Sequence, residues 1–130
     1  MTELVIYART DVFPAMKNEK RHRMGQAKPF SSKHYKKFYA SVREQFAQQI
    51  SKSEIGSALP IKKCINVQMD VHYPDKKRRD IHGLYEGIAD MLTHMHVWVD
   101  DCWTVTGPTY LIPHAAEKGG FVGIVVTLRF

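Results

Sequence analysis

Three aspartates in the second half of the chain have the side chains that hydrolytic chemistry often needs. Asp80 stands just before a predicted helix, and Asp100 and Asp101 follow its end. If the chain turns back far enough, these carboxylates converge and repel one another unless a cation lies between them. Mg²⁺ or Mn²⁺ is the natural cation, since both favour oxygen ligands and could direct water at a phosphodiester. The spacing leaves open a plainer interpretation, in which Asp80 only caps the helix and Asp100–Asp101 form a turn.

The same predicted helix adds three candidate side chains. His82, Glu86 and Asp90 are spaced at i, i+4 and i+8, which places them along one helix face, roughly opposite the apolar stripe. Glu86 could donate a further carboxylate, and His82 could act as a metal ligand or a base. The alternative is a face that is simply solvated, and this is what we expect of Asp90 taken alone.

Basic residues are clustered in two places, and a polyanionic partner explains such clusters best. The chain carries a net charge of +6 and a sequence pI of about 9.4. One cluster lies within residues 17–37 and the other is the run 76–79. A merely solubilising surface would be served as well by dispersed charges of both signs, whereas clusters on a small domain indicate nucleic acid. A basic patch does not distinguish DNA from RNA, or binding from cutting. The candidate nucleic-acid contacts are Lys17, Lys20, Arg21, Arg23, Lys76, Lys77, Arg78 and Arg79.

The hydrophobic pattern predicts the elements that must position these groups. Alternating and β-rich runs predict strands, and apolar residues at three-, four- and seven-residue spacings predict two helices. We expect strands at 3–8, 65–71, 103–112 (interrupted at Gly107–Pro108) and 121–128. One helix should run from Ser31 or Ser32 to about Ser51, and the other should begin after Asp80. The order β-α-β-α-β-β predicts an α/β (α+β) fold, a single domain over residues 1–130 with a small mixed sheet and two helices.

The stretch between the first strand and the first helix is expected to be an extended loop. From about Asp11 to Pro29 it is polar and basic, contains prolines and a glycine, and has no apolar period. Loops of this length in compact domains tend to be functional.

The buried faces follow from the same periodicities. The expected core residues are Tyr35, Phe38, Tyr39, Val42, Phe46 and Ile50 in the first helix, Ile65, Val67, Met69 and Val71 in the second strand, and Ile81, Leu84, Ile88, Leu92 and Met95 in the second helix.

Several classes of protein are excluded by composition. No run of apolar residues is long enough to span a membrane, and the first residues look like a strand rather than a secretory signal. Cys64 and Cys102 match no zinc spacing and are expected to be reduced, buried thiols. We therefore expect a cytoplasmic protein without a membrane partner.

The segment from His72 to Asp101 resembles the core of the RusA-type Holliday junction resolvases. In that family a basic run precedes Asp-x-Asp-Asn-Leu at the start of a helix. A Lys follows on the first turns, and then come Asp-x-Leu and an apolar-aromatic run that ends in Asp-Asp. The corresponding residues here are Lys76-Lys-Arg-Arg-Asp80, Asp90-Met-Leu92 and Val97-Trp-Val-Asp-Asp101. The upstream loop is similar to the family's Pro- and Arg-bearing loop through Pro14, Lys17, Arg21 and Arg23.

The resemblance implies a homodimer that binds four-way DNA junctions and nicks two strands with Mg²⁺ or Mn²⁺. By position, Asp80 matches the first catalytic aspartate of the family and Asp101 the last. Two departures stand out: His82 and Gly83 replace the family's second Asp and its Asn, and Glu86 replaces a Lys needed for activity. Imidazole is a poor Mg²⁺ ligand, and loss of the Lys removes a cation that could orient a phosphate.

We therefore predict a homodimeric, structure-selective DNA endonuclease. Its catalytic residues would be Asp80, His82, Glu86 and Asp101, and its metal site would consist of Asp80, His82, Asp100 and Asp101. The alternative is a junction-binding protein of the same fold that no longer cuts, and the His82–Glu86 pair separates these two hypotheses. A third interpretation, a small basic DNA- or RNA-binding domain with incidental carboxylates, predicts no metal dependence.

Overall fold

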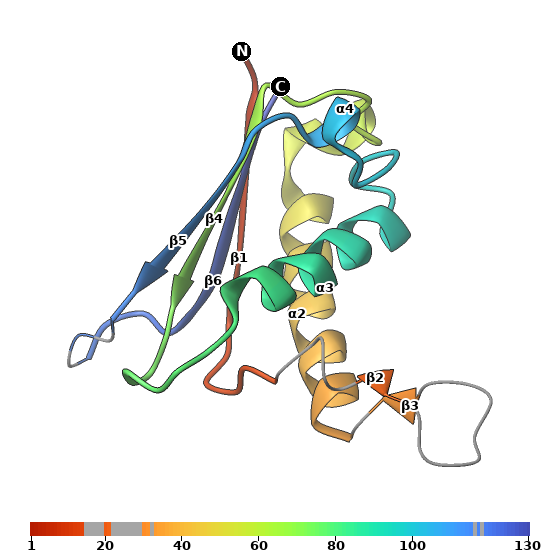
Figure 1. Cartoon of the computed structure of the whole chain (residues 1–130). Coiled ribbons are helices and arrows are strands. Elements are labelled where there is room, and N and C mark those ends of the chain that lie inside the picture. The colour runs from red at the N-terminus through yellow and green to blue at the C-terminus, as the bar shows by residue number, and fades with distance from the viewer. Residues whose placement is uncertain (15–19, 22–29, 32, 116, 118) are drawn as a thin grey trace.

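A four-stranded sheet forms the centre of the structure, a computed structural model that describes residues 1–14, 20–21, 30–31, 33–115, 117 and 119–130 (Figure 1). The sheet order is β1-β6-β4-β5. Its strands are β1 (Glu3–Arg9), β4 (Asn66–His72), β5 (Thr109–His114) and β6 (Gly123–Arg129). β6 is antiparallel to both β1 and β4, whereas β4 and β5 are parallel, so the predicted mixed sheet is confirmed.

Two long helices, α2 (Lys33–Lys52) and α3 (Ile81–His94), lie on the same side of this sheet (Figure 1). Two shorter helical elements are η1 (Glu54–Ala58), a 3₁₀ helix after α2, and α4 (Trp103–Thr106), a single turn before β5. The strands β2 (Lys20–Arg21) and β3 (Phe30–Ser31) pair with each other in the segment expected to be a loop. Residues 11–14 of that segment form no helix or strand, and residues 15–19 and 22–29 lie outside the described residues.

The core fills the space between the sheet and the two helices. β1 and β4 alternate strictly between the two faces, and only one face is fully buried, as the period of two in their sequences predicts. The predicted helical stripes are also confirmed: their central residues are buried, and Tyr39, Ile50, Ile81 and Met95 pack partly buried at the margin.

The predicted strand at 103–112 is wrong in its first half. The amides of Val105 and Thr106 both donate to the Cys102 carbonyl, which closes the turn of α4, and β5 begins only at Thr109. Gly107 ends α4 at φ 67°, and a Cβ there would lie 2.8 Å from the Ile65 carbonyl oxygen. Ile65, expected in the core, precedes β4 and is 53% exposed.

The two cysteines are both free, as predicted, but their burial differs. Cys64 is buried, and this burial raises the pKa of its thiol. Cys102 is exposed, so the prediction of a second buried thiol is wrong. Among the helices that the structure describes, none combines the length and apolar character needed to cross a membrane.

Side chains of α2 cover the outer edge of the sheet. The Gln49 amide accepts from the Tyr7 N–H (2.8 Å) and donates to the Tyr7 carbonyl (2.6 Å). Gln45, one helical turn earlier, makes the same pair of hydrogen bonds with Arg9, at 2.8 and 3.0 Å. Two glutamines at i and i+4 thus stand in for a neighbouring strand beside β1.

Candidate active site and nucleic-acid interface

Asp80 sits at the amino-terminal end of α3, where its carboxylate accepts a hydrogen bond from the Gly83 N–H at 3.1 Å. The residue has extended backbone angles, and it satisfies one of the amides that the first helical turn leaves unpaired. Its predicted role as a helix cap is confirmed. The carboxylate is exposed, so capping leaves one oxygen facing solvent.

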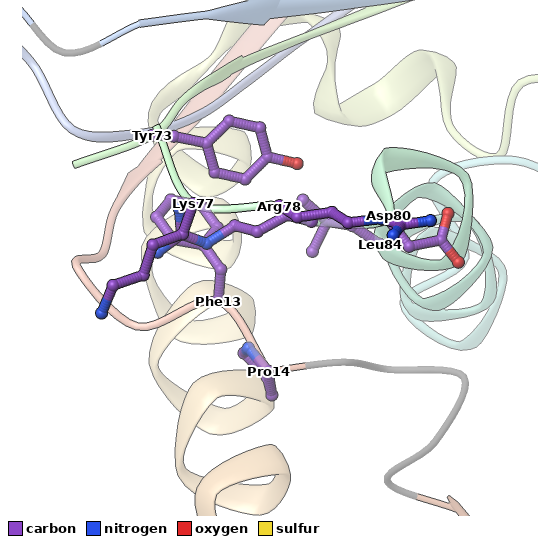
Figure 2. Close-up of a pocket in the computed structure, with 8 residues that line it drawn as sticks. Phe13, Pro14, Tyr73, Lys77, Arg78, Asp80 and Leu84 are labelled. Atoms are coloured by element: carbon purple, nitrogen blue, oxygen red, sulfur yellow. The ribbon is translucent and has the colours of Figure 1, made fainter. Parts of the chain in front are cut away.

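A hollow of about 720 Å³ opens beside this helix end. Figure 2 shows Tyr73 and Phe13 on one side of it, and Asp80 and Leu84 at the start of α3 on the other. The remaining lining residues are Pro14, Lys77, Arg78 and Arg79. The hollow therefore combines aromatic and cationic side chains at the positive end of a helix dipole, a setting that suits a phosphate group.

Within the basic turn, Lys76–Arg79, the four cations have different surroundings. Arg79 makes two hydrogen bonds to Asp75, at 2.5 and 3.2 Å, and its guanidinium lies 5.2 Å from the Tyr73 ring and 5.8 Å from the Phe13 ring. These hydrogen bonds, with another from the Lys77 amide, lower the pKa of Asp75 to about 2. Arg79 thus holds the turn together, whereas Lys76, Lys77 and Arg78 are exposed and available for phosphates.

A second acidic group lies toward the other end of α3. The segment before it is fixed to the core, because the Ile61 amide donates to the Val97 carbonyl and the Val99 amide donates to the Ile61 carbonyl. The buried Trp98 indole also donates to the Thr93 hydroxyl at 2.8 Å. Asp100 then accepts from the Asp101 amide at 2.8 Å. This anchoring brings the Asp101 side chain against α3.

The acidic cluster, which consists of Asp90, Asp100 and Asp101, is electrostatically crowded. Partial burial raises the pKa of Asp101, and hydrogen bonding and charge repulsion from Asp100 and Asp90 raise it further. Burial raises the pKa of the Tyr85 phenol, and its hydrogen bond to Thr109 lowers it in part. The charge of Asp101 makes a smaller contribution that also raises it. Carboxylates crowded together in this way bind a cation more readily than isolated ones.

The structure does not bring all the predicted site residues together. Asp80 and Asp90 are ten residues apart along α3, or roughly 15 Å at 1.5 Å per residue, and Asp101 lies beside Asp90. His82 and Glu86 are exposed between these two ends. Within the described part of the chain, no three His, Cys, Asp or Glu side chains are arranged to hold a metal ion together. In one protomer, therefore, Asp80 and Asp101 belong to separate groups.

Sequence reasoning undervalued Asp90, which was expected to be merely solvated but approaches Asp101. The signal that could have found it was its place at i+8 on the face of His82 and Glu86. Of the predicted nucleic-acid contacts, Lys17 and Arg23 lie outside the described residues, and Lys20 and Arg21 form β2. Their contact with DNA stays a prediction.

The fold and the site together define a small mixed α/β domain that carries a basic turn and an acidic cluster at two ends of one helix. The chain belongs to the endodeoxyribonuclease RusA family, whose model matches residues 12–127. The resemblance drawn from the sequence is thereby confirmed.

Individual relatives carry the same name. The chain is 32% identical over 74 residues to the crossover junction endodeoxyribonuclease RusA of Escherichia coli (strain K12), a match that covers 57% of each chain. It is likewise 32% identical over 89 residues to the crossover junction endodeoxyribonuclease rusA of Enterobacteria phage 82, covering 67% of this chain and 69% of that one. The similarity thus spans little more than half the length of the E. coli relatives.

Proposed function

We propose that this protein is a structure-selective DNA endonuclease that resolves four-way junctions. The observation that carries the proposal is the family match, which runs through the whole region of the acidic cluster and the basic turn. The relatives are named for cutting crossover junctions, and the electrostatics of this chain agree with a polyanionic substrate, since its net charge is +6. Both supports point to DNA as the partner.

We further propose that Mg²⁺ or Mn²⁺ is the cofactor. Asp100 and Asp101 are the side chains that would contact the ion, because a cation would relieve the crowding that Asp90 adds to them. Since no three such side chains of the described residues are arranged to hold an ion together, this pair would supply only part of the ion's coordination shell. When bound, such an ion activates water and stabilises the leaving oxygen of a phosphodiester. Asp80 and His82, the other residues expected at the metal, lie about two to three helical turns before Asp90, at the amino-terminal end of α3.

The chain's own cations would position the substrate. Lys76, Lys77 and Arg78 are exposed beside the hollow at the start of α3, where phosphate oxygens meet both their charges and the helix amides. Arg79 keeps this turn in shape through Asp75 rather than by contacting DNA. Binding and cutting would therefore rest on opposite ends of one helix.

A catalytically impaired junction-binding protein is the second candidate. It is favoured by the replacement of the family's Asp and Lys by His82 and Glu86, and by the separation of Asp80 from Asp101. This candidate keeps the fold, the basic turn and DNA binding, and it differs only in lacking cleavage.

We propose a homodimer, supported by the uncovered face of the sheet. On this face Val5 and Tyr7 are 48% and 46% exposed, and Ile112 is 36% exposed. Two charged pairs on this face are formed within the chain, since Arg129 donates to Glu3 at 3.1 Å and His114 lies 2.8 Å from Asp70. The guanidinium of Arg9 lies 5.5 Å from the Phe121 ring. A face that combines exposed apolar side chains with ion pairs formed within the chain is compatible with its own copy, and a two-fold dimer suits paired nicks.

The decisive experiment incubates the protein with a synthetic four-way junction in Mg²⁺, in Mn²⁺ and without metal. We expect metal-dependent nicking by the native protein, none by Asp101→Asn, and equal junction binding by both, because binding rests on the basic turn. Asp11→Asn, which removes a carboxylate outside both acidic groups, is the matched control and should cut normally. Binding without cleavage under every condition would establish the second candidate instead.

A further inference from the structure

The two tryptophans of the chain lie close in sequence but in opposite environments. Trp98 is fully buried, and its indole N–H is satisfied by Thr93. Trp103 is 81% exposed, far more than any other described aromatic side chain. An exposed indole forgoes the large stabilisation that burying it would bring, which points to a role outside the fold.

The backbone that carries Trp103 is rigid although the ring is exposed. Its carbonyl accepts from the Gly107 amide at 2.9 Å, and α4 is tied to the sheet by a 2.6 Å hydrogen bond from the Cys64 amide to the Val105 carbonyl. Val105 and Thr106 bury the inner side of the turn. The indole is therefore presented at a defined place, so a ligand meeting it loses little to the ordering of the backbone.

The ring borders a shallow hollow of about 880 Å³. Its walls are mainly apolar, from Ile65, Pro108 and Gly107, and the exposed Lys63 contributes a cation. A flat aromatic surface beside an apolar hollow and a cation matches two parts of a nucleotide: the base, which stacks, and the phosphate, which the cation attracts.

We propose that Trp103 forms a stacking site for one base of the DNA strand that passes the acidic cluster. This inference rests on the proposed endonuclease function. Trp103 lies two residues after Asp101, at most ~7 Å along an extended chain, which corresponds to about two base steps of 3.4 Å in a stacked strand. A base held on the indole thus sets which phosphodiester lies beside Asp101. Trp103 acts as a positioning residue for cleavage.

The test compares Trp103→Leu, which keeps an apolar side chain but removes the π-face, with Trp103→Phe, which keeps a smaller one. Junction binding is measured without metal, so that cleavage cannot intervene. We expect Trp103→Leu to weaken binding at least about fivefold, the lower end of base–aromatic stacking, and Trp103→Phe to remain within about threefold of the native protein. Val99→Ala, which removes exposed apolar surface four residues away, is the matched control and should bind normally.

Fluorescence supplies an independent readout. Junction DNA should quench the native emission, and the quenching should vanish in Trp103→Phe, whose remaining indole, Trp98, is buried. In metal, Trp103→Leu should also shift the positions of the nicks, an effect that mere destabilisation would not produce. Unchanged melting temperatures will show that the variants fold, as expected for an exposed residue.

Each result decides one of the two proposals. If Trp103→Leu binds and quenches like the native protein while junctions are still cut, the stacking site is overturned and the endonuclease stands. If Trp103→Leu loses binding only because its mass changes from that of a dimer to that of a monomer, Trp103 contacts a second copy rather than a base. This result also overturns the stacking site. Trp103-dependent binding without cleavage keeps the stacking site and overturns the nuclease.

Discussion

Individual side chains of this protein work in small groups whose members are held by their neighbours. Asp101 is brought to α3 by the buried Trp98 segment, and there it meets Asp90 and Asp100. Asp80 is occupied by its helix cap. What each carboxylate can do is thus decided by the element that carries it as much as by its own chemistry.

The crowding of the acidic cluster predicts a pH-dependent gain of stability on removing Asp90. The pKa of Asp101 is raised above the unfolded value of about 3.9, so the native state binds the proton more tightly and loses stability as the pH rises through the native pKa. Asp90→Asn relieves this loss, and it should raise the melting temperature by about 2 °C at pH 7 but hardly at all at pH 3. Glu54→Gln, an exposed carboxylate on η1, is the control. A gain of equal size at both pH values would show that charge crowding is not the cause.

The two departures from the family pattern predict an altered choice of metal. Imidazole tolerates Mn²⁺ better than Mg²⁺, so native cleavage should be much faster with Mn²⁺. His82→Asp with Glu86→Lys restores the family's hard ligand and its cation, and it should raise the Mg²⁺-dependent nicking rate about tenfold or more. The measurement is the nicking rate in Mg²⁺ and in Mn²⁺ for the native protein, the double variant and each single variant. If the native protein cuts in neither metal and the double variant does cut, the native protein is a junction-binding protein that has lost its cleavage activity.

At the scale of elements, α3 joins two different tasks. Its first turn meets the basic turn and the hollow of Figure 2, and its later turns meet the acidic cluster. A rigid helix keeps phosphate contacts and carboxylates at a fixed separation, which a loop would not do.

The division of labour within the basic turn can be tested with two neighbouring arginines. Arg78→Gln should leave stability unchanged and reduce the slope of log affinity against log salt by about one unit, as expected for one lost phosphate contact. Arg79→Gln removes the partner of Asp75 and should instead lower the melting temperature by roughly 3 °C at pH 7. The same slope for Arg78→Gln as for the native protein would show that this side chain does not contact phosphate.

The stability part of this prediction has a pH signature. Because the native pKa of Asp75 is about 2, the pair with Arg79 stabilises the protein fully above the unfolded pKa of about 3.9, and this stabilisation is lost as the pH falls toward 2. The difference in melting temperature between Arg79→Gln and the native protein should therefore shrink between pH 4 and pH 2.

At the scale of the whole molecule, the two long helices lie on one face of the sheet, and the described part of the chain leaves the other face open to a second copy. Light scattering at micromolar concentration should give about 30 kDa, twice the 15.0 kDa of one chain. Ile112→Lys places a charge on this face and should shift the mass to that of the monomer, whereas Ile65→Lys, at a more exposed position that precedes β4, should not. A native monomer would count heavily against resolution by paired nicks.

The fold was more predictable than the site, for a physical reason. Periodicity reports which side chains are buried, and β1, β4, α2 and α3 have clean periods, so their faces followed from the sequence. Residues 103–106 have side chains typical of a strand, yet two hydrogen bonds to the Cys102 carbonyl close them into a helical turn. The β-propensity of these residues does not predict such hydrogen bonds. The approach of Asp101 to Asp90 rather than to Asp80 depends on where the chain returns over α3, and spacing carries no information about that.

The two edges of the sheet differ, because glutamines of α2 bond part of the β1 edge and leave the β5 edge open. At β1 the backbone groups of Tyr7 and Arg9 are already bonded by Gln49 and Gln45, whereas among the described residues no side chain bonds the backbone of β5. The half of the β1 edge that Tyr7 and Arg9 span is therefore closed to a further strand, whereas the β5 edge can accept one. If two copies join through β5, both open edges are consumed and growth ends at two, so association through strand edges terminates instead of propagating into a fibre.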